Sequence, residues 1–158
     1  MTQVAVFWTI AAATVAWAIA ECCRVLGWQM MLARLVWSAG AVAMTVHAVS
    51  AFAIVYRGSH EVALAETARQ TAALTGFDSG SGLYVNYAFL TIWLAEAAWW
   101  WSGPAARGRT AGLGWARLGF FLFMFVNGAV IFADGWIRTI GIVSVTAVVG
   151  AAIARSRI

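Results

Sequence analysis

The side chains able to do chemistry in this chain of 158 residues are few, and several fall inside hydrophobic stretches. Two histidines occur, His47 and His60. His47 lies near the middle of one apolar run, Glu96 within a second and Asn127 within a third. A charge at the centre of a bilayer costs at least about 2.5–3.5 kcal/mol, so ionisable groups inside spanning segments are candidates for function.

Depth in the membrane groups these residues into a candidate site on the outer side. On the topology derived below, the residues of the outer half of the membrane are His47, Asn127 and Asp134. They lie beneath a loop that carries His60 and Glu66. Imidazole and carboxylate ligands suit Cu, Zn or Fe. The sequence therefore predicts a site for a metal ion or small ligand built on His47, His60 and Glu66, with Asn127 and Asp134 contributing.

The spacing of the two histidines sets a condition on this site. Thirteen positions separate His47 from His60, which is about 20 Å along a continuous helix. They meet only if the chain folds back at Gly58 and Ser59. Haem held by two imidazoles would need both histidines and ranks below a metal ion. The simpler alternative is a buried His47 that hydrogen-bonds to a neighbouring helix.

Two other functions fit the same residues. Glu96 could join His47 and Asn127 in a proton or ion relay, conducting within an oligomer. The chain could also be an accessory subunit with no chemistry of its own, whose partners are larger membrane proteins or further copies of itself. The sequence has no nucleotide-binding, hydrolase, zinc-protease or nucleic-acid-binding motif, which favours a protein that is not an enzyme and binds no nucleic acid.

The composition assigns the chain to the membrane. It is 63% hydrophobic and 10% charged, whereas soluble domains are nearer half apolar and a quarter charged. A soluble fold of this length cannot bury so much apolar surface, so lipid must cover the remainder. Arginine supplies all ten basic residues, a bias that suggests a bacterial inner membrane.

The pattern of hydropathy predicts an all-α bundle of five transmembrane helices in a single domain. Each segment approaches the roughly 20 apolar residues that a spanning helix needs. The predicted spans are residues 4–20, 35–56, 83–101, 118–133 and 137–154.

The arginines predict the orientation of these spans. Basic residues gather in the first loop, the third loop and the C-terminal tail, whereas the second loop is net negative. The Arg-rich set is Arg24, Arg34, Arg107, Arg109, Arg117, Arg155 and Arg157. The positive-inside rule puts this set in the cytoplasm. Five spans with the N-terminus outside and the C-terminus inside satisfy the rule.

The long second loop contains a further predicted helix, at residues 60–74. Ser59 suits its N-cap, and Gly76 suits its C-terminal end. One face of this helix is polar and the other weakly apolar, so we expect an amphipathic extracytoplasmic helix between the second and third spans.

Overall fold

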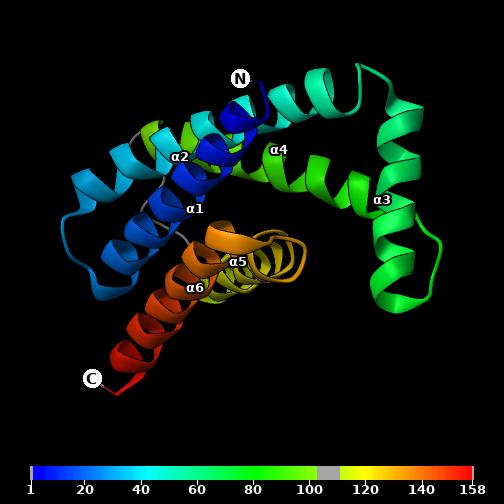
Figure 1. The fold of residues 1–158 in the computed structure, drawn as a ribbon. Coiled ribbons are helices and arrows are strands. Elements are labelled where there is room, and N and C mark those ends of the chain that lie inside the picture. Colours follow the sequence, from blue (N-terminus) through cyan, green and yellow to red (C-terminus); the bar gives the residue numbers. More distant parts are fainter. Residues whose placement is uncertain (1, 103–110, 158) are drawn as a thin grey trace.

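The computed structural model describes residues 2–102 and 111–157, and in both ranges the chain forms helices and no strand (Figure 1). The elements are α1 (Thr2–Leu26), α2 (Met30–Ser50), η1 (Ala51–Val55), α3 (His60–Thr75), α4 (Gly82–Trp101), α5 (Ala111–Phe125), η3 (Val126–Ile131) and α6 (Gly135–Ser156). The all-α prediction is confirmed for these ranges. Arg107 and Arg109 of the predicted third loop lie outside the described residues.

Four of the helices are long and apolar enough to cross a membrane, which is compatible with a membrane location. They cover Val4–Leu26, Met30–Val55, Gly112–Ile131 and Gly135–Ser156. The third predicted span, at residues 83–101, corresponds to α4, which has 20 residues but is not among these four. Its sequence includes Asn86 and Glu96, which lower its hydropathy.

The helices pack as neighbours, with α1 antiparallel to α2 and running in the same direction as α6 (Figure 1). α1 lies against both α2 and α6, α2 also contacts α4, and η3 packs on α6. In Figure 1, α1 and α2 run side by side in opposite directions, and α3 stands at one side of the bundle and runs across the direction of α4.

Aromatic rings fill the centre of the bundle. The side chains of Trp17, Trp37 and Trp93 are fully buried. Trp17 stacks on Phe125 with ring centroids 4.2 Å apart. Trp93 lies 5.5 Å from Trp37 and donates its indole N–H to the Trp37 carbonyl at 3.3 Å. Burial of these large rings, with the indole N–H of Trp93 satisfied, ties α2, α4 and α5 together.

Two glycines permit the closest helix contacts. A Cβ at Gly141 of α6 would lie 2.2 Å from the carbonyl oxygen of Ala129 in η3, and a Cβ at Gly40 of α2 would lie 2.8 Å from the Trp93 ring. Small residues let helix backbones approach in this way when lipid supplies no hydrophobic drive between helices.

Helix α3 begins and ends where the sequence predicts. The Ser59 hydroxyl accepts a hydrogen bond from the Val62 amide at 3.3 Å, as an N-cap does. Gly76 ends the helix in the left-handed conformation, with φ of 78°.

Candidate functional site

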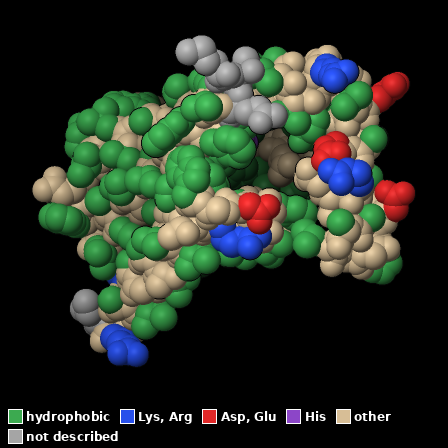
Figure 2. Space-filling view, viewed as in Figure 1, with side chains coloured by type: hydrophobic (Ala, Val, Ile, Leu, Met, Phe, Trp, Pro, Cys, Tyr) green, Lys and Arg blue, Asp and Glu red, His purple; other side chains and the backbone are tan. Residues whose placement is uncertain are grey.

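A cavity of about 770 Å³ lies between the helices. Every helix of the described chain contributes to its wall. Figure 2 shows a hollow between the hydrophobic body of the bundle and the side that carries most of the acidic side chains in that view. A volume of this size falls within the range of small-molecule binding sites, roughly 300–1,000 Å³.

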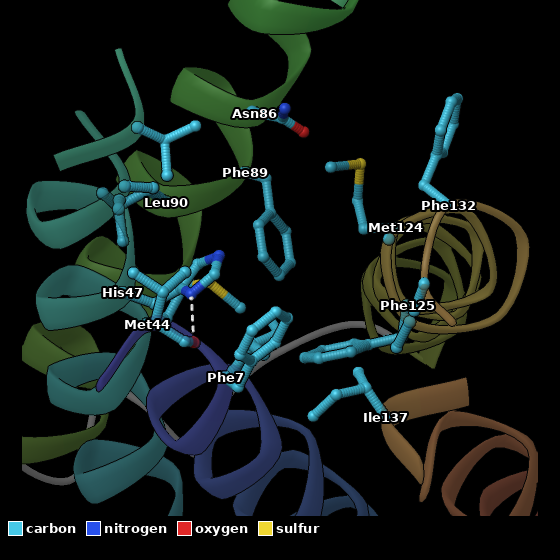
Figure 3. Close-up of a pocket in the computed structure, with 18 of the residues that line it drawn as sticks. Phe7, Met44, His47, Asn86, Phe89, Leu90, Met124, Phe125, Phe132 and Ile137 are labelled. Carbon is cyan, nitrogen blue, oxygen red and sulfur yellow. Dashed lines mark hydrogen bonds between the residues drawn. The ribbon is translucent and has the colours of Figure 1, made fainter. Parts of the chain in front are cut away.

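The wall of the cavity is mainly apolar and aromatic (Figure 3). Its apolar side chains include Phe7, Met44, Phe52, Phe89, Leu90, Met124, Phe125, Phe132 and Ile137. The two methionines come from α2 and α5, which face each other across the cavity in Figure 3. Methionine is flexible and polarisable, so this wall can adapt to an apolar occupant.

Two π-helical segments border the cavity. Ala51, Phe52 and Val55 of η1 line it on one side, and Gly128 and Ala129 of η3 line it on another. π-helical turns are rare and occur frequently at functional sites. Their presence on two sides of one cavity marks this region as the candidate site.

His47 is a half-buried polar residue of this wall. Its Nδ1 lies 3.0 Å from the backbone carbonyl oxygen of Val6 in α1 (Figure 3). The hydrogen bond joins α2 to α1 and fixes the plane of the ring. The alternative interpretation of His47, as a residue that hydrogen-bonds to a neighbouring helix, agrees with this geometry.

Most of the other polar residues of the wall lie at one end of the cavity, next to α3 and the turn between η3 and α6. They are Tyr56, Gln70, Asn86, Tyr87 and Asp134. The cavity therefore has polar groups at one end and His47 farther along α2, with apolar side chains between them.

His60 lies outside the cavity wall and is exposed. The chain does turn at Arg57 and Gly58, which both have positive φ, of 53° and 72°. The turn brings His60 to α4, where its Nδ1 lies 3.2 Å from the Tyr87 hydroxyl. The two imidazoles thus have different partners, and of the two histidines only His47 lines the cavity.

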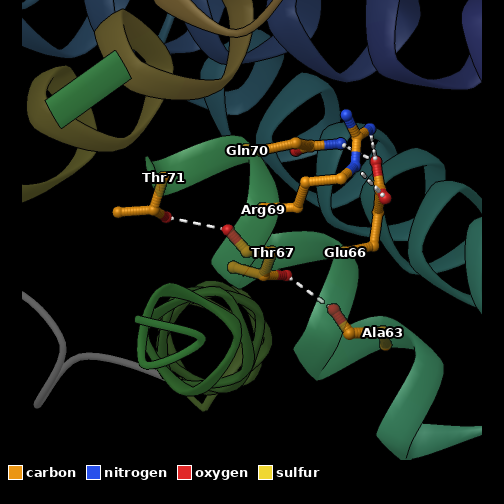
Figure 4. Close-up of polar contacts among 6 residues, drawn as sticks. All are labelled: Ala63, Glu66, Thr67, Arg69, Gln70 and Thr71. Atoms are coloured by element: carbon orange, nitrogen blue, oxygen red, sulfur yellow. Dashed lines mark hydrogen bonds and ion pairs between the residues drawn. The ribbon is translucent and has the colours of Figure 1, made fainter. Parts of the chain in front are cut away.

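Glu66 is held within α3 itself (Figure 4). Its carboxylate accepts hydrogen bonds from Arg69 Nε at 2.8 Å and from Gln70 Nε2 at 2.9 Å. These donors lower the pKa of Glu66 to about 2, with Arg69 the largest cause and Gln70 the next. The hydroxyls of Thr67 and Thr71 bond to backbone carbonyls of the same helix, so these polar contacts of α3 are local.

The last two predicted site residues also have neighbouring partners. Asn127 Nδ2 donates to the Phe123 carbonyl at 2.7 Å, one turn earlier in the same helix. Asp134 accepts from Arg138 Nη2 at 2.9 Å and lines the cavity. Of the five predicted residues, the structure thus brings His47 and Asp134 to one cavity and leaves His60, Glu66 and Asn127 outside its wall.

Within residues 2–102 and 111–157, no group of three or more His, Cys, Asp or Glu side chains is arranged to hold a metal ion. The Cu, Zn or Fe hypothesis, and the haem hypothesis beside it, gain no support from this geometry. The predicted relay gains none either, because His47 and Asn127 bond to backbone carbonyls rather than to each other.

An ion pair at the other end of the bundle is a feature that sequence reasoning missed. The Arg117 guanidinium of α5 donates to both carboxylate oxygens of Glu21 in α1, and the Nη2–Oε2 distance is 2.9 Å. The Glu21 side chain is 0% exposed and that of Arg117 8% exposed. Glu96 Oε2 lies 4.0 Å from Arg117 Nε. The pairing joins α1, α4 and α5 where apolar side chains surround the charges.

Aromatic rings also contact the arginines at this end of the bundle. The Arg117 guanidinium carbon lies 5.1 Å from the centroid of the Trp37 ring, and that of Arg24 lies 4.3 Å from the Trp100 ring. The structure pairs Glu21 of α1 with Arg117 of α5, a pair that was not predicted from the sequence. Arg117 is far from Glu21 in the sequence. Its place at the end of a predicted span was the only sequence feature that pointed to this ion pair.

Comparison with known proteins returns no match, whether with protein families, with curated sequences or with solved structures. The function must therefore be argued from the geometry of the cavity.

Proposed function

We propose that this chain is a membrane protein that binds a small amphipathic molecule in the cavity on the outer side of its helix bundle. The observation that supports it is the cavity of about 770 Å³, with an apolar aromatic wall and polar groups gathered at one end. Sites for small molecules typically combine such a wall with a few polar groups that orient the ligand.

The distribution of polar groups favours an amphipathic occupant over a metal ion or a hydrophilic solute. The wall is dominated by phenylalanine, methionine and aliphatic side chains. Burial of an apolar chain against them is favourable by roughly 25 cal/mol per Å². A hydrophilic solute would lose its water shell to a wall with few hydrogen-bonding partners, which costs free energy.

The proposed topology has five spans, with α4 crossing the membrane between the other four. Trp101 at the end of α4 donates to the Ser38 hydroxyl in the first half of α2, at 2.9 Å. The bonded residues put the C-terminal end of α4 beside the N-terminal half of α2. This antiparallel pairing supports α4 as a spanning helix in the protein.

The charges support an orientation with the C-terminus in the cytoplasm. Arg24, Arg117 and Arg155 line one small pocket of about 270 Å³. Arg155 Nη1 also donates to the Val25 carbonyl at 2.9 Å. Three segments that the positive-inside rule assigns to the cytoplasm therefore meet at one end. The candidate cavity then belongs to the outer leaflet, with α3 at the outer surface.

Binding by a variant that fills the cavity tests this function. Gly128 lines the cavity, and a Cβ there would meet no atom within 4 Å, so Gly128→Leu adds a side chain at the wall with room for its first carbon. Gly119→Leu is the matched control, because Gly119 lies in α5 with the same open surroundings and is not part of the wall.

The probe is 4-nonylphenol, titrated into the full chain in detergent by calorimetry, with protein-free micelles as the blank. We expect saturable binding to the original chain and to Gly119→Leu, and weaker binding to Gly128→Leu. Equal binding to all three proteins, or no saturable binding to any, would contradict the proposal.

A further inference from the structure

The hydrogen bond of His47 to Val6 determines which ring nitrogen carries the proton and which one is left as an acceptor. A backbone carbonyl oxygen can only accept, so the contact of 3.0 Å with Val6 requires the proton on Nδ1. A neutral imidazole carries one N–H, and Nε2 is then left with a lone pair. The fold thus selects the tautomer through a backbone group of another helix.

Nε2 has no partner among the described residues. No hydrogen bond or ion pair within residues 2–102 and 111–157 involves this atom. Nε2 is also not fully buried, since it is not one of the fully buried side-chain nitrogens without a partner in that part of the chain. Figure 3 shows the ring edge that carries Nε2 directed away from Val6, on the side of Phe89 and Leu90.

A metal ion is a poor candidate for this lone pair, because the described chain brings no cluster of ligands to it. Phe89, Phe125 and Met44 supply apolar surroundings, which favour a single directed hydrogen bond. A ligand that fills the cavity covers Nε2, and an acceptor covered without a partner costs free energy, so a ligand that brings a donor is favoured. The chemical group that fits is a hydroxyl attached to an apolar body.

We infer that the ligand of the cavity carries a hydroxyl group that donates a hydrogen bond to Nε2 of His47. The inference rests on the proposed function and adds the chemical class of the ligand, a lipid-soluble alcohol or phenol. The apolar body lies against the phenylalanine and methionine side chains. Of the other polar groups of the wall, Tyr56 lies nine residues after His47, just past the end of η1, which is roughly 13 Å along a helix.

Two variants of His47 separate its two nitrogens. His47→Asn places an amide nitrogen near the position of Nδ1, so it keeps a donor to Val6 and removes the acceptor at Nε2. His47→Gln carries an amide oxygen near the position of Nε2 and keeps an acceptor there. A loss of binding caused by misfolding would affect both variants, whereas a loss of the acceptor affects His47→Asn alone.

The probes are 4-nonylphenol and 4-nonylanisole, which differ by the replacement of the hydroxyl by a methoxy group that cannot donate. We expect the original chain and His47→Gln to bind the phenol about two- to ten-fold more tightly than the anisole, as one neutral hydrogen bond allows. We expect His47→Asn to bind both probes equally.

Each other outcome overturns the inference, and one of them also overturns the proposed function. Equal binding of the two probes by the original chain overturns the hydroxyl inference and leaves the proposed function standing. A phenol preference that persists in His47→Asn also overturns the inference, because the hydroxyl then bonds elsewhere. No saturable binding of either probe overturns the proposed function, and the inference falls with it.

Discussion

Arg117 and Glu21, 96 residues apart in the sequence, form a two-pronged ion pair inside the bundle. Two parallel N–H···O contacts match the planar guanidinium to the carboxylate, which gives geometric specificity as well as energy. The pair fixes α5 against α1 at the end of the bundle opposite the cavity. Its burial distinguishes it from the pair between Asp134 and Arg138, whose side chains are 90% and 44% exposed.

Removing one partner of the buried pair should destabilise the protein strongly. Glu21→Gln leaves the buried Arg117 charge with Glu96, at 4.0 Å, as its remaining carboxylate. Breaking a buried pair typically costs about 3–5 kcal/mol, and we expect a loss at the lower end of this range in the free energy of unfolding. The double variant Glu21→Leu with Arg117→Leu should recover part of it, since the charges of this pair are then absent while Glu96 loses its contact with Arg117.

Asp134→Asn is the control for this prediction, because an exposed pair contributes only about 0–1 kcal/mol. Thermal unfolding in detergent, followed by circular dichroism, measures all three changes. A Glu21→Gln protein as stable as Asp134→Asn would show that the buried pair does not hold the helices.

Gly141 should be intolerant of any side chain. Alanine there would bring Cβ to 2.2 Å from the Ala129 carbonyl oxygen, so α6 and η3 must separate. Overpacking of this kind typically costs about 1–3 kcal/mol. Gly150→Ala lies in the same helix with nothing within 4 Å of the added carbon, and we expect a neutral or stabilising effect. Equal melting temperatures of the two variants would contradict the close packing of α6 on η3.

The Glu66 carboxylate should remain ionised well into the acid range. Its pKa in the folded chain is about 2 against an ordinary value of 4.5, since Arg69 and Gln70 donate to the charged form. A lowered pKa contributes stability that is present above about pH 4.5 and is lost as the pH falls toward 2. Carboxyl ¹³C NMR of Glu66 should therefore titrate near pH 2. In Arg69→Gln the midpoint should rise toward 4.5, and a midpoint near 4.5 in the original chain would refute the pairing.

The number of spans can be tested by locating one loop and the C-terminus on either side of the membrane. Phe77, 76% exposed between α3 and α4, is replaced by cysteine in a chain with Cys22→Ala and Cys23→Ala. Five spans predict that an impermeant maleimide labels Cys at this position from outside intact cells. A green fluorescent protein fused to the C-terminus should then fluoresce inside. Four spans would put the C-terminus outside, where the fusion stays dark.

The sequence predicts the helices well because each carries local signals. Apolar runs mark the spans, and Ser59 and Gly76 mark the ends of α3. The predicted spans are shorter than the helices, since a run of apolar residues reports the part within lipid and the helix continues beyond it. The first span, predicted at residues 4–20, belongs to a helix that runs to Leu26.

The site is harder to predict, for two physical reasons. An apolar cavity is a space between helices, and Phe89 or Met124 has the same local pattern whether it lines a cavity, fills the core or faces lipid. The partner of His47 is the backbone carbonyl of Val6, which leaves no mark in the sequence. His47 was singled out because a polar residue in an apolar run is conspicuous, whereas the link between Glu21 and Arg117 depends on where α5 lies relative to α1 in the fold.

The most direct test of the central claim is to map where an amphipathic probe binds. An alkylphenol that carries a diazirine in its chain is bound to the full protein in detergent and illuminated, and the labelled peptides are identified by mass spectrometry. We predict adducts on the cavity wall, for example at Phe7, Met44 and Phe89, that unlabelled 4-nonylphenol suppresses. Adducts spread over outward-facing side chains such as Val42, Phe123 and Val143, without suppression, would contradict the existence of a binding site in this cavity.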